Sequence, residues 1–237
     1  MSQEIMLLVI TAASLGFIHT TLGPDHYIPF IAMSKARHWS VLKTSLITIS
    51  CGIGHVLGSV IIGAIGIGFG LAIRELQGIE SARGEIATWL LISFGLVYLT
   101  WGLRKAFKNK PHSHVHIHEN GDKHFHLHTH EKDHLHVHLE DKEANITPWI
   151  LFTIFIFGPC EVLIPLFIYA ATIESTLGVI LVTSIFGITT ILTMLTIVLI
   201  SLYGIHLISF DKLERYAHAL AGGMILLCGV GVKFFGL

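Results

Sequence analysis

The sequence predicts an all-α polytopic membrane protein with six transmembrane helices, arranged as a 3+3 inverted repeat with broken first and fourth helices. Three observations predict this class: an apolar composition, six long stretches almost free of charge, and a motif that recurs in both halves of the chain. Of the 237 residues, 52% are hydrophobic and only 13% are charged, and the mean hydropathy is +0.70. We therefore expect a protein that contacts the lipid bilayer, is not an enzyme and has no nucleic-acid partner.

Six apolar stretches account for the predicted crossings, because a helix needs about 20 apolar residues to span the hydrocarbon core. They are Ile5–Ser34, Thr44–Ile73, Ile86–Leu103, Ile146–Ile173, Thr176–Phe210 and Tyr216–Val232. The first and fourth stretches are longer than one crossing needs, and each contains a Gly-Pro pair, at 23–24 and 158–159. Proline inside a helix removes a backbone hydrogen bond, so we expect both helices to break at these pairs.

Basic residues predict the orientation, because cytoplasmic loops of membrane proteins carry an excess of Lys and Arg. With the N-terminus outside, twelve Lys and Arg residues lie in the inner loops and three in the outer loops. We therefore predict a cell-membrane protein in three regions: a first three-helix repeat at 1–107, a His-rich cytoplasmic loop at 108–147 and a second three-helix repeat at 148–237.

The two halves share a motif at a constant offset. The tetrapeptide Gly-Pro-Asp-His at 23–26 matches Gly-Pro-Cys-Glu at 158–161, and Gly52 and Gly187 are separated by the same 135 residues. Because each half has three predicted crossings, the two halves must be inserted with opposite topology. In transporters built this way the binding site lies at the interface of the repeats, beside the broken helices.

Ionisable residues around the first break are the main candidates for function. His19 lies about one helical turn before the Gly-Pro pair, and Asp25 and His26 follow that pair directly. An ionisable side chain at bilayer depth costs on the order of 2.5 kcal/mol or more, so it marks a candidate functional site. Two imidazoles and a carboxylate suit nickel, cobalt, zinc or iron(II). The structural alternative is that Asp25 and His26 form a hydrogen-bonded pair that stiffens the break.

Three residues elsewhere are further candidate metal ligands: His55, Cys160 and Glu161. His55 lies between glycines in the second stretch, where it either completes the site or forms a hydrogen bond between helices. Cys160 supplies a soft thiolate ligand or is simply a small buried residue. Glu161 is a candidate ligand, proton carrier or partner for His26.

The central loop contains eleven histidines in three alternating blocks, and His-rich tracts bind transition metals. They are His112, His114, His116, His118, His124, His126, His128, His130, His134, His136 and His138. Strict alternation is a strand pattern, and the Asn-Gly pair at 120–121 is a hairpin signal. We expect bound metal to close the loop into a ribbon of two or three strands. The alternative is a solvated linker.

Several of these features together resemble the nickel/cobalt transporter superfamily, which includes nickel/cobalt efflux proteins and urease-accessory-like permeases. The similar motifs are His-x5-Asp-His at 19–26, Gly-His-Val-Leu-Gly at 54–58 and the His-rich loop. Importers of that family carry His-x4-Asp-His, so the spacing here is one residue longer. The resemblance implies that His19, Asp25, His26 and His55 coordinate a metal ion.

We therefore expect a membrane transporter of a divalent metal ion, nickel or cobalt first and zinc or iron next, that requires no resident cofactor. Efflux is favoured over uptake because a cytoplasmic His-rich loop can collect metal from inside. A homo-oligomer and a cytosolic metallochaperone are candidate partners.

Two other functions stay open. Membrane thiol–disulfide electron carriers of the cytochrome-biogenesis type look similar at Gly-Pro-Cys, 158–160, but they need a reactive cysteine in each half. The first half has Asp25 at that position, so Cys51 would have to take its place. A metal-buffering accessory protein for metalloenzyme maturation would instead use the His-rich loop as its main site.

Overall fold

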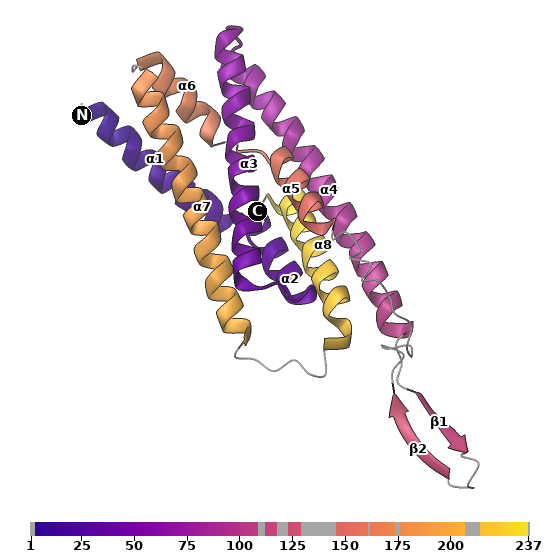
Figure 1. Cartoon of the computed structure of the whole chain (residues 1–237). Coiled ribbons are helices and arrows are strands. Elements are labelled where there is room, and N and C mark those ends of the chain that lie inside the picture. Colours follow the sequence, from indigo (N-terminus) through magenta and orange to yellow (C-terminus); the bar gives the residue numbers. More distant parts are fainter. Residues whose placement is uncertain are drawn as a thin grey trace.

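A computed structural model of the chain consists mostly of helices, as predicted (Figure 1). It describes residues 3–108, 112–117, 123–128, 146–160, 162–173, 176–206 and 214–236. Five helices in these ranges are long and apolar enough to cross a membrane, namely Gln3–Leu22, Val41–Gly68, Ile73–Lys108, Thr176–Gly204 and Glu214–Phe235. The chain is therefore a multi-pass membrane protein.

The first predicted crossing is interrupted where the sequence places its Gly-Pro pair. Helix α1 covers Gln3–Leu22, a short 3₁₀ helix η1 covers Pro24–His26, and helix α2 covers Ile28–Ala36. Gly23 between them is extended, with φ −86° and ψ 97°. Proline is favoured as the first residue of a helix because it has no N–H to leave unsatisfied, and Pro24 occupies that position in η1.

The fourth predicted crossing differs from expectation in length. It consists of two short helices, α5 (Thr147–Phe157) and α6 (Leu163–Ile173), each with 11 residues. A helix of about 20 residues is needed to cross the bilayer, so neither is long enough alone. By helix length, the described residues therefore offer five crossings and not the six predicted. The chain continues through α7 (Thr176–His206), η2 (Glu214–Tyr216) and α8 (Ala217–Phe235).

Two long helices separate the breaks. Helix α3 covers Val41–Gly68, and α4 covers Ile73–Lys108, so α4 begins well before the predicted start at Ile86. The charged residues between 74 and 85 resemble a loop in sequence, yet they continue the helix. Glu80 and Arg83 lie three residues apart, a spacing at which helical side chains meet, and they form an ion pair.

Figure 1 shows α4 and α8 side by side, and α3 next to α7. Helices α4 and α8 approach so closely that a Cβ added at Gly102 would lie 2.4 Å from the Ala219 nitrogen, and one at Gly222 would lie 2.2 Å from the Leu99 nitrogen. Small residues at such interfaces let helix backbones pack directly in a membrane, where no hydrophobic force drives helices together.

Buried apolar side chains form two clusters. One includes Phe30, Met33, Leu151, Met194 and Ile225, from α2, α5, α7 and α8. The second includes Leu8, Ala12, Leu163, Val182 and Phe186, from α1, α6 and α7. Many large apolar side chains of the long helices remain exposed, which a membrane protein directs toward lipid.

Part of the His-rich loop forms a two-stranded antiparallel hairpin. Strand β1 covers His112–Ile117 and β2 covers Lys123–His128. Histidine is paired with histidine at three positions: His112 with His128, His114 with His126, and His116 with His124. The alternating pattern therefore predicts these two strands. The block of His134, His136 and His138, which would form a third strand, lies outside the described residues, as do His118 and His130.

Candidate metal-binding site

The first break brings two histidines together by bending the chain back after α1. His19 lies in the last turn of α1, and its carbonyl accepts a hydrogen bond from the Gly23 nitrogen at 3.0 Å. The backbone N–H of His26 then donates to the Gly23 carbonyl, with 3.1 Å between nitrogen and oxygen, and this hydrogen bond closes the turn of η1. The imidazole centroids of His19 and His26 lie 4.7 Å apart.

The His26 ring is oriented by two hydrogen-bond acceptors. Its Nδ1 lies 3.1 Å from Asp25 Oδ1 and 3.2 Å from the Gly23 carbonyl oxygen. Because a carboxylate and a carbonyl only accept hydrogen bonds, Nδ1 carries the proton and Nε2 carries the lone pair. A carboxylate behind a histidine is the usual arrangement that fixes a metal-binding tautomer. The predicted Asp25–His26 hydrogen-bonded pair is thus present, and it leaves Nε2 available for a ligand.

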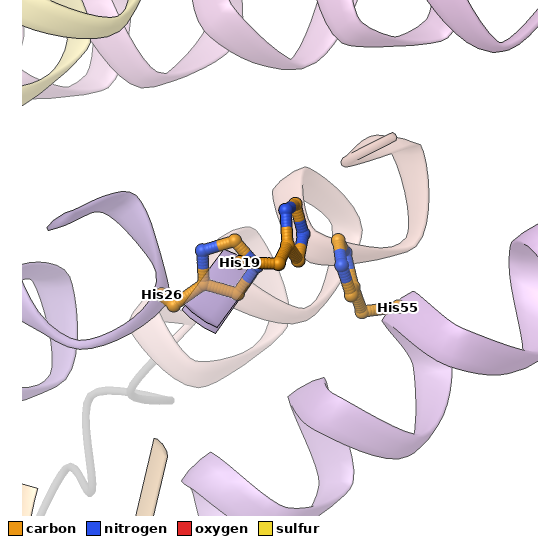
Figure 2. A group of neighbouring side chains, drawn as sticks. All are labelled: His19, His26 and His55. Atoms are coloured by element: carbon orange, nitrogen blue, oxygen red, sulfur yellow. The ribbon is translucent and has the colours of Figure 1, made fainter. Parts of the chain in front are cut away.

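His55 of α3 completes a group of three imidazoles (Figure 2). Its centroid lies 5.1 Å from that of His26 and 6.3 Å from that of His19. One ring nitrogen from each histidine can be chosen so that all three atoms lie within 4.8 Å of one another. The structure therefore brings together three histidines that span 36 positions of the sequence, from His19 to His55.

The three imidazoles have unused hydrogen-bonding capacity. The Nε2 atoms of His19, His26 and His55 are buried and have no hydrogen-bond partner. A buried polar atom without a partner costs about 1–3 kcal/mol, so three at one place need an explanation. A metal ion explains all three, since bonds of about 2.0–2.1 Å to imidazole nitrogens would draw these atoms inward.

Both Gly-Pro breaks contact this group through their glycines. A Cβ at Gly23 would lie 2.6 Å from His26 Nδ1, and one at Gly158 would lie 2.9 Å from His55 Nδ1. These distances are shorter than a carbon atom tolerates, so a side chain at either position would displace the neighbouring imidazole. The repeat predicts that the two breaks meet at one site, and Gly158 is the residue by which the second break reaches it.

The cysteine of the second break is held away from solvent by its surroundings. Cys160 is fully buried and packs in the second apolar cluster, with Leu8, Ala12 and Phe186 among its members. The group of three imidazoles does not include it. Its role as a metal ligand stays a prediction, and Glu161 lies outside the described residues.

A buried ion pair that the sequence does not suggest holds the second break in place. Glu80 is fully buried, and its Oε2 accepts hydrogen bonds from Ser59 Oγ at 2.9 Å and from the Cys160 nitrogen at 3.1 Å. Arg83 pairs with Glu80 and donates from Nη2 to the Ile156 carbonyl at 2.6 Å. Polar groups freed by a helix break must be satisfied inside a membrane, and this pair satisfies them.

A cavity of about 520 Å³ adjoins the imidazoles. All three histidines and Asp25 line it, and Glu85 and Lys233 line it as well. The two latter side chains form an ion pair with each other. The cavity therefore connects the imidazoles with a charged and more exposed part of the protein.

The described thiols are all buried. Cys51, Cys160 and Cys228 are free in the structure. Cys51 and Cys228 belong to the first apolar cluster, whereas Cys160 belongs to the second. The cluster that contains Cys160 therefore includes neither of the other two cysteines.

Comparison with known protein families gives a match over most of the chain. Residues 28–231 match the family described as "Cytochrome C biogenesis protein transmembrane region". No curated protein and no solved structure matches the chain. The matched range begins with α2 and ends within α8, so α1 and η1 precede it.

This match corrects two predictions from sequence. The chain does not match a nickel/cobalt transporter family, so the resemblance to that superfamily is wrong, and with it the prediction of nickel or cobalt transport. The motif at 19–26 and His55 carried that resemblance because they are suited to metal coordination. Coordination chemistry identifies a class of ligand and does not distinguish a carrier of ions from a protein that keeps its ion.

Proposed function

The chain belongs to the cytochrome c biogenesis transmembrane family, and we propose that it is a membrane electron carrier whose reactive centre is a bound metal ion instead of paired thiols. The observation that carries this proposal is that His19, His26 and His55 can each offer one ring nitrogen within 4.8 Å of the other two, and that each imidazole has a buried nitrogen without a hydrogen-bond partner. The family supplies the redox context, and the imidazoles supply the chemistry that the cysteines of this chain lack.

A thiol relay needs a thiolate that attacks a disulfide, and then a second thiol that resolves the mixed disulfide. Asp25 stands in the first break where such a relay would need a cysteine, and Cys160 packs against apolar side chains. Three imidazoles, those of His19, His26 and His55, lie at the first break instead. They can hold an ion that accepts and returns an electron without any bond to sulfur being formed.

The electron balance of the proposal is simple. A dithiol partner on one side of the membrane is oxidised to a disulfide and releases two electrons and two protons. An ion held by His19, His26 and His55 would supply one-electron transfer to a disulfide on the other side, which takes up the two electrons and two protons and becomes a dithiol. The protons exchange with water on each side.

The proposed ion is copper or iron. Imidazole ligands suit copper, iron, zinc and nickel, whereas zinc has no redox chemistry in proteins. His19, His26 and His55 would bind the ion, and Asp25 would fix the tautomer of His26 through Nδ1. This resident ion replaces the sequence-based expectation that no cofactor is required.

We also propose the six-crossing inverted repeat, with α5 and α6 together forming the sixth crossing. The matching Gly-Pro pairs at 23–24 and 158–159 support it, as do the helix ends that lie beside both pairs. The excess of basic residues supports an external N-terminus and a cytoplasmic His-rich loop. In this arrangement the loop hairpin would gather metal for the site. We keep the regions 1–107, 108–147 and 148–237 as proposed units.

Metal content tests the site. The full chain would be purified, loaded separately with copper and with iron, and washed before metal analysis. His26→Ala should retain about one ion fewer per chain than wild type, because a three-nitrogen site loses one of its ligands. His38→Asn is the matched control, since His38 is exposed and has a positive φ of 50°, which asparagine tolerates. The His-rich loop is the same in all variants, so the difference reports on the membrane site.

Electron flux tests the function. Liposomes containing the protein would enclose an aromatic disulfide whose thiolate product is coloured, and an impermeant dithiol would be added outside. Loaded wild type should release thiolate inside, and His26→Ala should not. Equal flux from the metal-free protein, or flux that is lost in Cys160→Ala and kept in His26→Ala, would contradict a metal centre.

A further inference from the structure

A second polar cluster lies at the opposite end of α4 from the Glu80–Arg83 pair. It consists of Arg37, which follows α2, Tyr98, Trp101 and Lys105 of α4, and His218 of α8. Figure 1 shows the end of α4, the start of α8 and the end of α2 near one another at the same end of the bundle. None of these five residues belongs to the metal site.

Aromatic rings hold two cations in this cluster. The Arg37 guanidinium carbon lies 5.6 Å from the Tyr98 ring centroid and 5.5 Å from that of Trp101. The Lys105 Nζ lies 5.4 Å from the Trp101 centroid. The two positive side chains therefore share one indole ring, and attraction to the ring offsets part of their mutual repulsion.

His218 adds no negative charge to balance these cations. Its Nε2 lies 3.1 Å from Lys105 Nζ, and its Nδ1 lies 2.8 Å from Tyr98 Oη. A lysine ammonium only donates, so Nε2 accepts, and Nδ1 carries a proton that it donates to the tyrosine oxygen. His218 is thus a neutral bridge that fixes Lys105 and Tyr98 in position.

Among the described residues, the cluster has two cations and no anion. In the part of the chain that the structure describes, no Asp or Glu forms an ion pair with Arg37 or Lys105. The Arg37 Nε is buried and has no hydrogen-bond partner. Helix dipoles favour cations near helix C-termini, which accounts for Lys105 in the last turn of α4. They do not account for a buried guanidinium N–H that lacks an acceptor.

The position of the cluster identifies the class of anion. It lies at the end of the candidate membrane span Ile73–Lys108, where tryptophan and tyrosine mark the boundary between hydrocarbon and water. Lipid headgroups carry their phosphates at this level, and a guanidinium with a neighbouring ammonium is a typical phosphate site. Trp101 is 42% exposed, so the cluster is open toward the bilayer.

We propose that Arg37 and Lys105 bind the phosphate of an anionic phospholipid headgroup, with Trp101 packed against the lipid at its side. Phosphate oxygens would accept from Lys105 and from the Arg37 guanidinium, which would turn to bring its buried Nε to the lipid, and the lipid's net negative charge would balance the two cations. Such a lipid would strengthen the link between the ends of α2 and α4 that Arg37 already makes with Tyr98 and Trp101.

Lipid binding by the purified full chain tests the proposal. The protein would be reconstituted in phosphatidylcholine vesicles with one part in ten of phosphatidylglycerol, extracted gently, and analysed by native mass spectrometry. We expect wild type to retain phosphatidylglycerol about tenfold in excess over its share of the vesicle, and Lys105→Gln to lower that excess at least threefold.

The matched control is Lys43→Gln, because Lys43 also lies over an indole ring, 5.6 Å from the Trp39 centroid at the start of α3, but neither residue belongs to the cluster. Arg37→Lys should weaken retention less than Arg37→Gln, and the exposed Lys105 provides the test if Arg37 variants do not fold. Equal retention of both lipids, or an equal loss in Lys43→Gln, would overturn the proposal. Displacement of phosphatidylglycerol by 10 mM inorganic phosphate, with phosphate bound in the absence of lipid, would overturn the assignment to lipid.

Discussion

The two Gly-Pro breaks of this protein share a sequence pattern and differ in what surrounds them. The first break, at 23–27, presents imidazole nitrogens without partners to a cavity. In the second, at 158–162, the Cys160 nitrogen and the carbonyls of Ile156 and Gly158 are bound by Glu80 and Arg83. The first break therefore has polar atoms available to bind a ligand. At the second break, the polar backbone atoms named above already form hydrogen bonds within the protein. A repeat can duplicate a backbone shape while only one copy carries the chemistry.

The largest effect should come from removing the support of the second break. Glu80→Ala would leave the Arg83 guanidinium without its carboxylate and the Cys160 nitrogen without its acceptor. Breaking a buried ion pair by removing one partner costs about 3–5 kcal/mol, so we expect the free energy of unfolding to fall by that amount. Tryptophan fluorescence during denaturation in detergent micelles would measure it.

Glu85→Ala is the matched control for this prediction. Glu85 pairs with Lys233 at an exposed position of the same helix, and exposed ion pairs contribute little to stability. Similar losses in the two variants would mean that the Glu80–Arg83 pair does not anchor the break.

The second prediction concerns the first break. Asp25→Ala removes the carboxylate that accepts from His26 Nδ1, so the ring can turn and change its tautomer. Loss of such a supporting group typically weakens metal binding 10–100-fold. Asp25→Asn, which keeps an oxygen acceptor, should lose less. Competition with a coloured chelator would measure both affinities, and a loss that is equal in Asn and Ala would show that charge alone matters.

Sequence patterns predict those parts of the molecule that local chemistry determines. Apolar length predicts the long helices, and the Gly-Pro pairs predict both breaks, because proline acts on its own turn of helix. His19 and His26 follow from the same local reasoning. His55 was harder to place, since a single membrane histidine is equally suited to a helix contact, and only the packing of α3 against α5 and α7 brings it to the site.

The Glu80–Arg83 pair shows why the rest could not be predicted. Charges between 74 and 85 suggest a loop, and composition alone does not reveal that one carboxylate turns inward to a break 80 residues away. The available signal was the three-residue spacing of Glu80 and Arg83, which fits one face of a helix. The prediction of metal transport is wrong for a related reason. Metal-binding residue types indicate a ligand, whereas transport is a property of the whole protein.

The third prediction links the two breaks at their point of contact. Gly158→Ala would place a Cβ 2.9 Å from His55 Nδ1 and 3.1 Å from the Phe155 carbonyl oxygen, so the imidazole or the break must shift. We expect metal affinity to fall about tenfold, which corresponds to about 1.4 kcal/mol. Gly78→Ala is the control, because nothing lies within 4 Å of its added Cβ. Unchanged affinity in Gly158→Ala would separate the second break from the site.

The smallest effect should come from the residue that a thiol relay would need most. Cys160→Ala removes one sulfur from an apolar cluster in which cysteine acts as a small hydrophobic side chain, so the free energy of unfolding should fall by about 1 kcal/mol. Metal content and electron flux should match wild type, because the Cys160 contact with Glu80 is made by the backbone nitrogen and survives the change. If flux were instead abolished while metal content stayed constant, the second break would carry the chemistry, and the difference between the two breaks would be the reverse of the one argued here.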